Sequence, residues 1–226
     1  MSKNFVEIKS AAQEGGPAEL AQELAAKLQA LQALDDSETL ARVRLQLDAA
    51  ELLTRLERKS DAWTLARNAF DSALAQEAWA DAVEACDVLF QCGQPESIAA
   101  LGMGVWLSVS FPVNPELTLA MLAHIVEETP HHADGAALAA VAARYVIDLR
   151  ANDEQHESLA FFANNLIAQV AERHGQVRDQ AALDAWMDRL ELRDPQDFLP
   201  RLGQVVNILV GNAWWFDRDE LRNKFD

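Results

Sequence analysis

The densest group of residues able to bind a metal ion or transfer protons lies in EETPHHADG, residues 127–135. Its side chains are carboxylates and imidazoles, ligand types that suit divalent transition metals, and they come from Glu127, Glu128, His131, His132 and Asp134. Adjacent histidines usually point apart, however, and the zinc-protease pattern HExxH does not occur. We therefore interpret the segment as a solvated loop between two helices and expect no metal and no cofactor.

Patterns that would mark a catalytic nucleophile or a phosphate site are also missing from the sequence. The chain lacks the GxSxG pattern of serine hydrolases and the phosphate loop of nucleotide-binding proteins. Cys86 and Cys92 are six residues apart, unlike CxxC metal or redox sites, and are interpreted as reduced, partly buried thiols. Gly102 and Gly104 lie in an apolar helical run with no strand before it, so close helix packing is the favoured role. We do not expect an enzyme.

The charge of the chain is concentrated in its middle third. The net charge is −17, and residues 61–160 hold fifteen acidic residues against Arg67, Arg144 and Arg150. Such a surface repels nucleic acid and anionic membranes and attracts a basic partner. No apolar run is long enough to cross a bilayer, and the first residues lack the apolar core of a signal peptide, so a cytoplasmic protein is expected.

The elements that must position these residues are helices. Half of the residues are hydrophobic, mostly Ala and Leu, while β-branched residues are scarce. Apolar residues recur at helical spacing, and the connections between the periodic segments are short. About ten helices are predicted, at approximately 17–34, 37–56, 60–74, 79–92, 96–106, 115–129, 135–150, 155–175, 180–192 and 200–210, with a short one after residue 217.

Several helix ends carry specific signals. Ser37 and Ser60 are predicted N-caps, and Asn114–Pro115 and Asp194–Pro195 each combine an N-cap with a proline at the first helical position. Pro200 removes a backbone donor, so a turn is expected at 195–199 before the helix that starts at 200. Residues 1–16 are expected to be a flexible N-terminal segment, and residues 17–226 a single all-α domain of antiparallel helical hairpins.

One stretch resembles a tetratricopeptide repeat. AWTLARNAF, residues 62–70, and WADAVEACDVLF, residues 79–90, match the two helices of that repeat at Trp63, Asn68, Ala69, Phe70, Trp79, Ala82 and Val83. Arg67 stands where the family prefers a small residue, and the link between the two halves is longer than usual. The resemblance implies a tetratricopeptide-like α-solenoid.

The resemblance also implies a groove lined by one face of the first helix of the repeat. The residues on that face would be Asp61, Thr64, Asn68, Asp71 and Ser72. Some family members clamp acidic peptide tails with basic residues there, whereas this face carries carboxylates. Ordinary exposed helix positions remain the alternative interpretation.

A second resemblance concerns the all-helical chaperones that assemble redox enzymes. Their loop motif joins Glu, Pro, Asp and His before a helix, and residues 127–135 hold the same residue types in another order. This resemblance implies a groove beside that loop for a basic targeting peptide or an immature subunit.

The segment GNAWWFDRDE, residues 211–220, places three aromatic residues next to four charged ones. We expect one of Trp214 and Trp215 to fill the end of the solenoid. The other is expected to be exposed beside Arg218 and Arg222 as a partner anchor, since Trp and Arg are enriched in interface hot spots. Burial of both rings as a C-terminal cap remains the alternative.

Taken together, these patterns predict a protein–protein interaction scaffold or adaptor. Its acidic surface favours a basic protein partner over nucleic acid or a membrane. The alternative is a dedicated cytoplasmic assembly chaperone for a redox enzyme or metalloenzyme, which would bind a basic targeting peptide or immature subunit.

Overall fold

The computed structural model describes residues 16–35 and 37–223, and this part of the chain is all-α. The predicted N-terminal segment therefore lies almost wholly outside the described residues. The helices, in chain order, are α2 (Pro17–Ala33), α3 (Thr39–Arg55), α4 (Lys59–Ala75), α5 (Trp79–Gln91), α6 (Ser97–Ser110), α7 (Pro115–Glu128), α8 (Gly135–Arg150), α9 (Asp153–Gly175), α10 (Gln180–Arg189), α11 (Pro195–Val210) and α12 (Arg218–Arg222).

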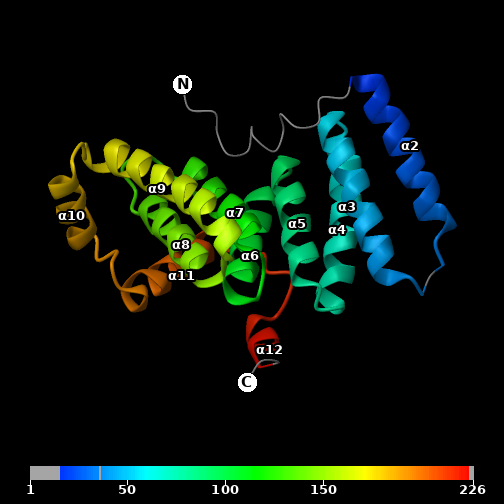
Figure 1. Cartoon of the computed structure of the whole chain (residues 1–226). Helices are drawn as coiled ribbons and strands as arrows, with labels where there is room; N and C mark the ends of the chain where they lie inside the picture. The colour runs from blue at the N-terminus through cyan, green and yellow to red at the C-terminus, as the bar shows by residue number, and fades with distance from the viewer. Residues whose placement is uncertain (1–15, 36, 224–226) are drawn as a thin grey trace.

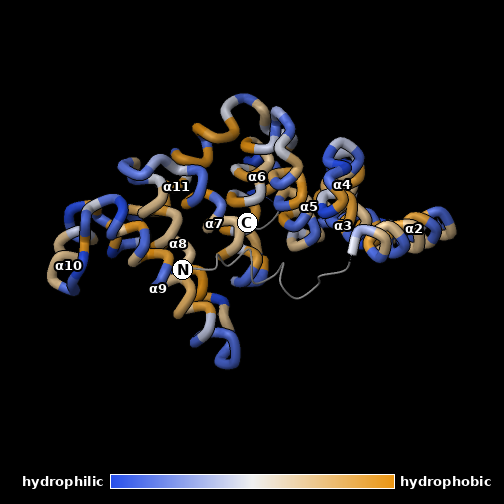
Figure 2. The backbone as a smooth tube through the Cα atoms, turned by 90° about the horizontal axis from the view of Figure 1, so that it is seen from above, coloured by the Kyte–Doolittle hydropathy of each residue, from blue (hydrophilic) through white to orange (hydrophobic). Residues whose placement is uncertain are grey.

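The helices from α2 to α9 pack in sequence order as a solenoid of hairpins, with α2 at one end and α10 at the other (Figure 1). The odd-numbered helices α3, α5, α7 and α9 also contact one another and form an odd row. No comparable contact joins α4 to α6 or α6 to α8, which form an even row. Seen from above, α4, α6 and α11 lie along one side of the molecule (Figure 2).

The gap between α6 and α8 is filled by α11, which returns to pack against both helices. Gly102 in α6 permits this approach, since a Cβ atom there would lie 2.6 Å from Cγ2 of Val210. At Gly104 a Cβ atom would meet Cε of Met121 at 2.5 Å and Cβ of Cys86 at 2.7 Å. Both glycines are therefore close helix-packing sites, as predicted from their apolar surroundings.

Several predicted helix ends are confirmed. Asn114 caps α7, because its Oδ1 accepts a hydrogen bond from the backbone N–H of Leu117 at 2.7 Å, and Pro115 follows at the first position. Asp217 caps α12 by accepting from the backbone N–H groups of the next turn. Gly211 ends α11 with φ +57°, a conformation that favours glycine.

Three predictions about helix boundaries are wrong. The α11 helix runs unbroken through Pro200 instead of starting there. Gln196, whose carbonyl loses its helical donor to the proline, is exposed, so water can satisfy it. Ser37 bonds to the Asp35 carboxylate and Ser60 lies inside α4, so neither is an N-cap.

The hairpin that resembles the tetratricopeptide repeat has a well-filled interior. Phe70 is fully buried, and Trp79 is 8% exposed and stacked on Phe111 with ring centres 4.0 Å apart. Trp63 is only half-buried within this hairpin. Its ring faces the C-terminal segment, which supplies the missing cover.

Buried apolar side chains form one cluster that extends from Leu20 in α2 to Leu221 in α12. Alanines such as Ala66, Ala69 and Ala82 are fully buried in it and let neighbouring helices approach closely. Among the described residues, no helix has both the length and the apolar character that a membrane span requires.

Candidate interaction site

The C-terminal segment lies between two helices of the even row. Ala213, Trp214, Trp215 and Phe216 pack against the core after the chain turns at Gly211. Their aromatic partners come from α4 and α6, two helices that make no extensive contact with each other. The segment therefore fills the space between α4 and α6, as α11 fills the space between α6 and α8. We call it, with the rings it contacts, the aromatic cluster: Trp63, Phe70, Trp106, Trp214, Trp215 and Phe216.

Trp215 joins the segment to α4. Its ring centre lies 6.2 Å from that of Trp63 and 5.3 Å from that of Phe70, both in edge-on arrangements. The guanidinium of Arg67 lies 4.2 Å from the Trp215 ring centre and forms an ion pair with Asp71. Such edge-on aromatic pairs and the cation–π contact stabilise the docked segment beyond simple burial.

Trp214 and Phe216 join the segment to α6. Their ring centres lie 6.1 Å and 5.5 Å from that of Trp106. Arg218 lies 4.1 Å from the centre of the Trp214 ring, and Arg222 lies 5.4 Å from that of Trp106. Three tryptophans in the cluster therefore each carry an arginine against the ring, a combination common in interface hot spots.

The predicted division between one structural and one accessible tryptophan is not found. Trp214 and Trp215 are both half-buried, and both contact rings of the helical core. Their position is also different from the prediction, because they lie along the side of the solenoid and not at its end. The helices α4 and α6 do not pack directly against each other. The space between them therefore accommodates both tryptophan rings.

The predicted groove residues on α4 lie beside this site, not within its contacts. Asp61, Thr64, Asn68 and Asp71 are exposed, and Ser72 is half-buried. Asp61 pairs with Arg58, Thr64 donates to the Ser60 carbonyl, and Asp71 pairs with Arg67. The contacts with the C-terminal segment come from Trp63, Arg67 and Phe70.

Sequence reasoning missed the role of Arg67, although a signal was present. Arg67 departs from the repeat pattern at a position where a small residue is preferred, and its long side chain reaches the Trp215 ring. Ile208 was also missed and is 81% exposed on α11. The neighbouring Asn207 accepts a hydrogen bond from Arg218 at 2.7 Å. An exposed isoleucine therefore directly follows, along α11, the residue that binds Arg218.

A second candidate surface runs along the odd row. Arg44 of α3 donates to Asp81 at 2.6 Å and to both carboxylate oxygens of Glu84 at 2.7 and 2.8 Å. The hydrogen bond to Glu84 is the main reason that the pKa of Arg44 is raised. One turn further along α5, Asp87 contacts His124 of α7 at 3.0 Å. We call this set the acidic row: Asp81, Glu84, Asp87 and Glu127.

His124 is the most buried ionisable side chain of that surface. Its side chain is 5% exposed, its Nε2 lies 3.0 Å from Asp87 Oδ1, and its Nδ1 lies 3.7 Å from Glu127 Oε2. Burial acts to lower its pKa, but the hydrogen bond and charge of Asp87, with help from Glu127, outweigh it and the net pKa is raised. The surroundings of His124 therefore favour its protonated form more than water does.

The loop at 127–135 does not gather its candidate ligands. Glu128, His131 and His132 are exposed, while Asp134 contacts His174 at 3.2 Å and Arg201 at 3.1 Å. Within residues 16–35 and 37–223, no group of three or more histidine, cysteine or acidic side chains is arranged to hold a metal ion.

The two cysteines lie in the helical interior. Cys86 and Cys92 are free and buried, and burial is the main cause of the raised pKa of each thiol. Both are therefore held in the protonated form, which is a poor nucleophile.

Comparison with protein-family models, curated proteins and solved structures finds no match for this chain. The resemblance to a tetratricopeptide repeat therefore stands on residues 62–90 alone, and the fold that is shown is an all-α helical solenoid.

Proposed function

We propose that the protein is an interaction scaffold or adaptor, and that its partner presents a basic surface. The observation that carries this proposal is the acidic row, in which Asp81, Glu84 and Asp87 of α5 lie beside Glu127 of α7. Arg44 and His124 pair with these carboxylates, and Gln91 donates a further hydrogen bond to Asp87 at 3.0 Å. The row lies within the stretch 61–160, where acidic residues outnumber Lys and Arg fifteen to three.

The physical basis is long-range attraction between unlike charges. Carboxylates on a helical surface raise the association rate of a basic partner and repel acidic competitors. Attraction between exposed charges is screened over about 8 Å at physiological ionic strength, so binding should weaken as salt rises. The proposal includes a cytoplasmic location, supported by the free thiols of Cys86 and Cys92.

The proposal retains the aromatic cluster as the anchor of the interface. Trp214, Trp215 and Arg218 combine the residue types of hot spots with partial exposure, and Ile208 adds a large exposed apolar side chain. A scaffold of this kind would use the acidic row for attraction and the cluster for short-range contact. The α4 residues Asp61, Thr64, Asn68, Asp71 and Ser72 would border that contact.

The experiment is affinity capture from an extract of the native cells, at low and at high salt, with mass spectrometry as the readout. The variant Glu84→Gln/Glu127→Gln removes two charges from the acidic row. The control Glu23→Gln/Glu220→Gln removes two charges from exposed positions on α2 and α12. The dissociation constant of each captured partner is then measured directly for all three proteins.

The expected partner is rich in Lys and Arg, is released by salt, and binds the row variant more weakly than the control. A partner whose affinity is the same at both salt concentrations would contradict the proposal. Equal weakening by the two variants would show that overall charge, and not the acidic row, matters.

A dedicated assembly chaperone is the second candidate. It is favoured by Glu127, which belongs both to the acidic row and to the 127–135 loop that resembles the chaperone motif. The same capture experiment separates the two candidates. A chaperone would retain one immature redox enzyme or its basic targeting peptide, whereas an adaptor would retain mature partners.

A further inference from the structure

The last long helix of the stack has an uncovered face. In α9 the residues Phe161, Asn165, Ala168 and Glu172 are spaced at helical intervals and are all exposed, with Phe161 at 63%. In a solenoid, the next hairpin of the stack would cover this face. Here the chain instead leaves the stack, because α11 turns back to α6 and α8.

The following helix, α10, covers only the C-terminal end of α9. Trp186 of α10 is 1% exposed and donates from Nε1 to His174 Nδ1 at 3.1 Å. A Cβ atom at Gly175 would lie 2.8 Å from Cδ1 of this ring, so Trp186 is tightly seated at that point. The rest of α10 makes little contact with α9, which leaves a groove between the two helices.

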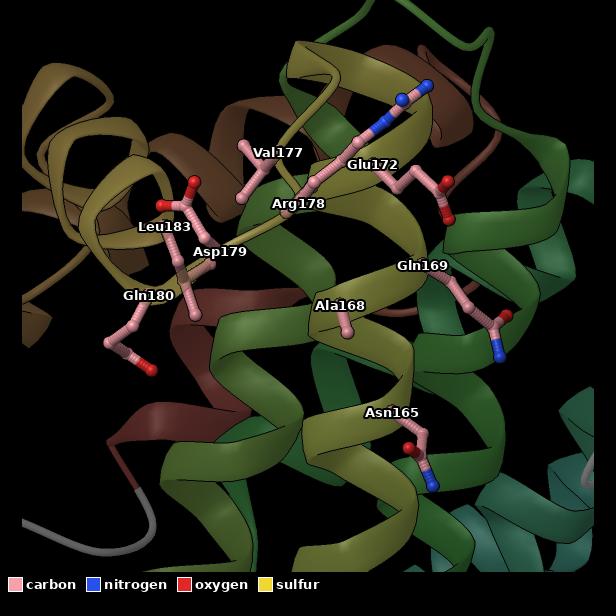
Figure 3. Close-up of a pocket in the computed structure, with 10 residues that line it drawn as sticks. Asn165, Ala168, Gln169, Glu172, Val177, Arg178, Asp179, Gln180 and Leu183 are labelled. Carbon is pink, nitrogen blue, oxygen red and sulfur yellow. The ribbon is translucent and has the colours of Figure 1, made fainter.

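The groove holds an open cavity of about 450 Å³, lined by α9, α10 and the link between them (Figure 3). Ala168, Ala171, Val177 and Leu183 give it an apolar surface, and the amides of Asn165, Gln169 and Gln180 add hydrogen-bonding groups. The small alanines of α9 allow another backbone to approach closely, as small residues do elsewhere in this fold. A cavity of this size holds a few apolar side chains.

The surroundings of the groove are acidic. Between Asp153 and Arg189 the chain carries seven carboxylates and three arginines. Of the three, Arg173 donates to the carbonyl oxygen of Val126 at 2.6 Å, and Arg178 lines the cavity together with the carboxylates of Glu172 and Asp179. A segment that enters the groove is therefore met by apolar side chains at the centre and by an excess of negative charge around it.

We propose that the groove between α9 and α10 binds an amphipathic α-helix of the basic partner. The apolar face of that helix packs on Ala168, Val177 and Leu183, and its flanking Lys and Arg side chains face the surrounding carboxylates. The exposed stripe from Phe161 to Glu172 is about 17 Å long, or three helical turns. This inference rests on the proposed function for the basic character of the partner and adds a binding site and a secondary structure.

The test uses synthetic helical peptides of about 14 residues, long enough for four turns. One carries leucines at i, i+3 and i+7 with Lys and Arg flanks, a second has Glu flanks, and a third has serines in place of the leucines. Binding to the full chain is measured by fluorescence anisotropy. Ala168→Trp fills the cavity without changing the charge, and Ala25→Trp is the matched control on an exposed position of α2.

We expect the basic, leucine-bearing peptide to bind the wild type and Ala25→Trp equally, and Ala168→Trp about tenfold more weakly, as for the loss of one buried apolar contact. No measurable binding of this peptide, or equal binding to both variants, would overturn the proposal. So would equal binding of the Glu-flanked or the serine peptide.

The proposal would also be overturned if either of two other occupants were found in the groove. One is a second copy of this chain, shown by a dimer that dissociates in the variant Phe161→Arg. The other is the segment 1–15 of the same chain, shown by peptide binding that appears only after its deletion. The proposed function is tested separately, by partner capture with the Glu84→Gln/Glu127→Gln variant. The peptide experiment tests only the groove, so the two proposals can fail independently.

Discussion

The guanidinium of Arg67 in α4 lies 4.2 Å from the ring centre of Trp215, near the other end of the chain. This contact joins the repeat-like hairpin to the segment that follows α11. Asp71 also holds the guanidinium through an ion pair. The C-terminal aromatic residues are therefore part of the fold of the N-terminal half, in addition to any role in binding.

Replacing Trp215 with Ala should destabilise the protein by about 2 kcal/mol, because a half-buried aromatic ring loses its contacts with Trp63 and Phe70. In a double-mutant cycle with Arg67→Ala, the coupling energy should be about 0.5–1 kcal/mol, the range of partly exposed cation–π contacts. Urea denaturation of the four proteins measures both quantities. A coupling energy of zero would show that the observed geometry contributes nothing to stability.

Replacing Phe70 with Ala should cost about 3–5 kcal/mol of unfolding free energy, as for other fully buried aromatic residues. Phe161→Ala is the matched control, since that ring is 63% exposed. The unfolding free energy of Phe161→Ala should differ from that of the wild type by no more than about 0.5 kcal/mol. Thermal or denaturant unfolding compares the two variants, and a loss below about 1 kcal/mol for Phe70→Ala would contradict the observed packing.

Two glycine-to-alanine substitutions should act in opposite directions. At Gly102 the added methyl group would lie 2.6 Å from Val210 Cγ2, so overpacking should destabilise the protein by about 1–3 kcal/mol. At Gly203 in α11 the new Cβ meets no atom within 4 Å, so improved helix propensity should stabilise it by about 0.5–1 kcal/mol. Equal midpoints of denaturation for the two variants would refute the close approach of α11 to α6.

The contact between His124 and Asp87 should make stability depend on pH. The folded state raises the pKa of His124 above its unfolded value of about 6.5, so the folded state binds the proton more tightly. The resulting stabilisation is fully present below the unfolded pKa and is lost as the pH rises through the folded pKa.

The variant Asp87→Asn removes the main partner that raises this pKa. At acidic pH the unfolding free energy of the wild type should be larger than that of Asp87→Asn. The difference between the two unfolding free energies should shrink as the pH becomes alkaline. Urea denaturation over a pH series checks this, with His131→Gln on the exposed loop as the control. A difference that grows with pH would contradict the expectation that the folded state raises the pKa of His124.

Local signals in the sequence were sufficient to predict most of the helices. The apolar periodicity of α2 to α9 and the pair Asn114–Pro115 act within one or two turns, and the structure follows them. Pro200 misled the prediction because the loss of one exposed hydrogen bond is small beside the burial of Phe198 and Leu202 in the same helix.

The aromatic cluster could not be predicted in the same way. Periodicity shows that Trp63 and Phe70 belong to an apolar face, but it does not identify the distant segment that covers them. The same limit applies to His124 and Asp87, which belong to different helices and meet only because α5 and α7 are neighbours in the odd row. Only the folded arrangement of the helices brings these residues together.

The docking of residues 213–216 between α4 and α6 has a consequence for synthesis on the ribosome. A simple stack of hairpins can fold progressively from its N-terminus, because each hairpin needs only its neighbours. In this protein Trp63, Phe70 and Trp106 lack their final cover until residues 213–216 have emerged. Every nascent chain therefore exposes an aromatic strip along α4 and α6 during translation, and a transcript truncated before Trp214 encodes a protein that keeps it exposed.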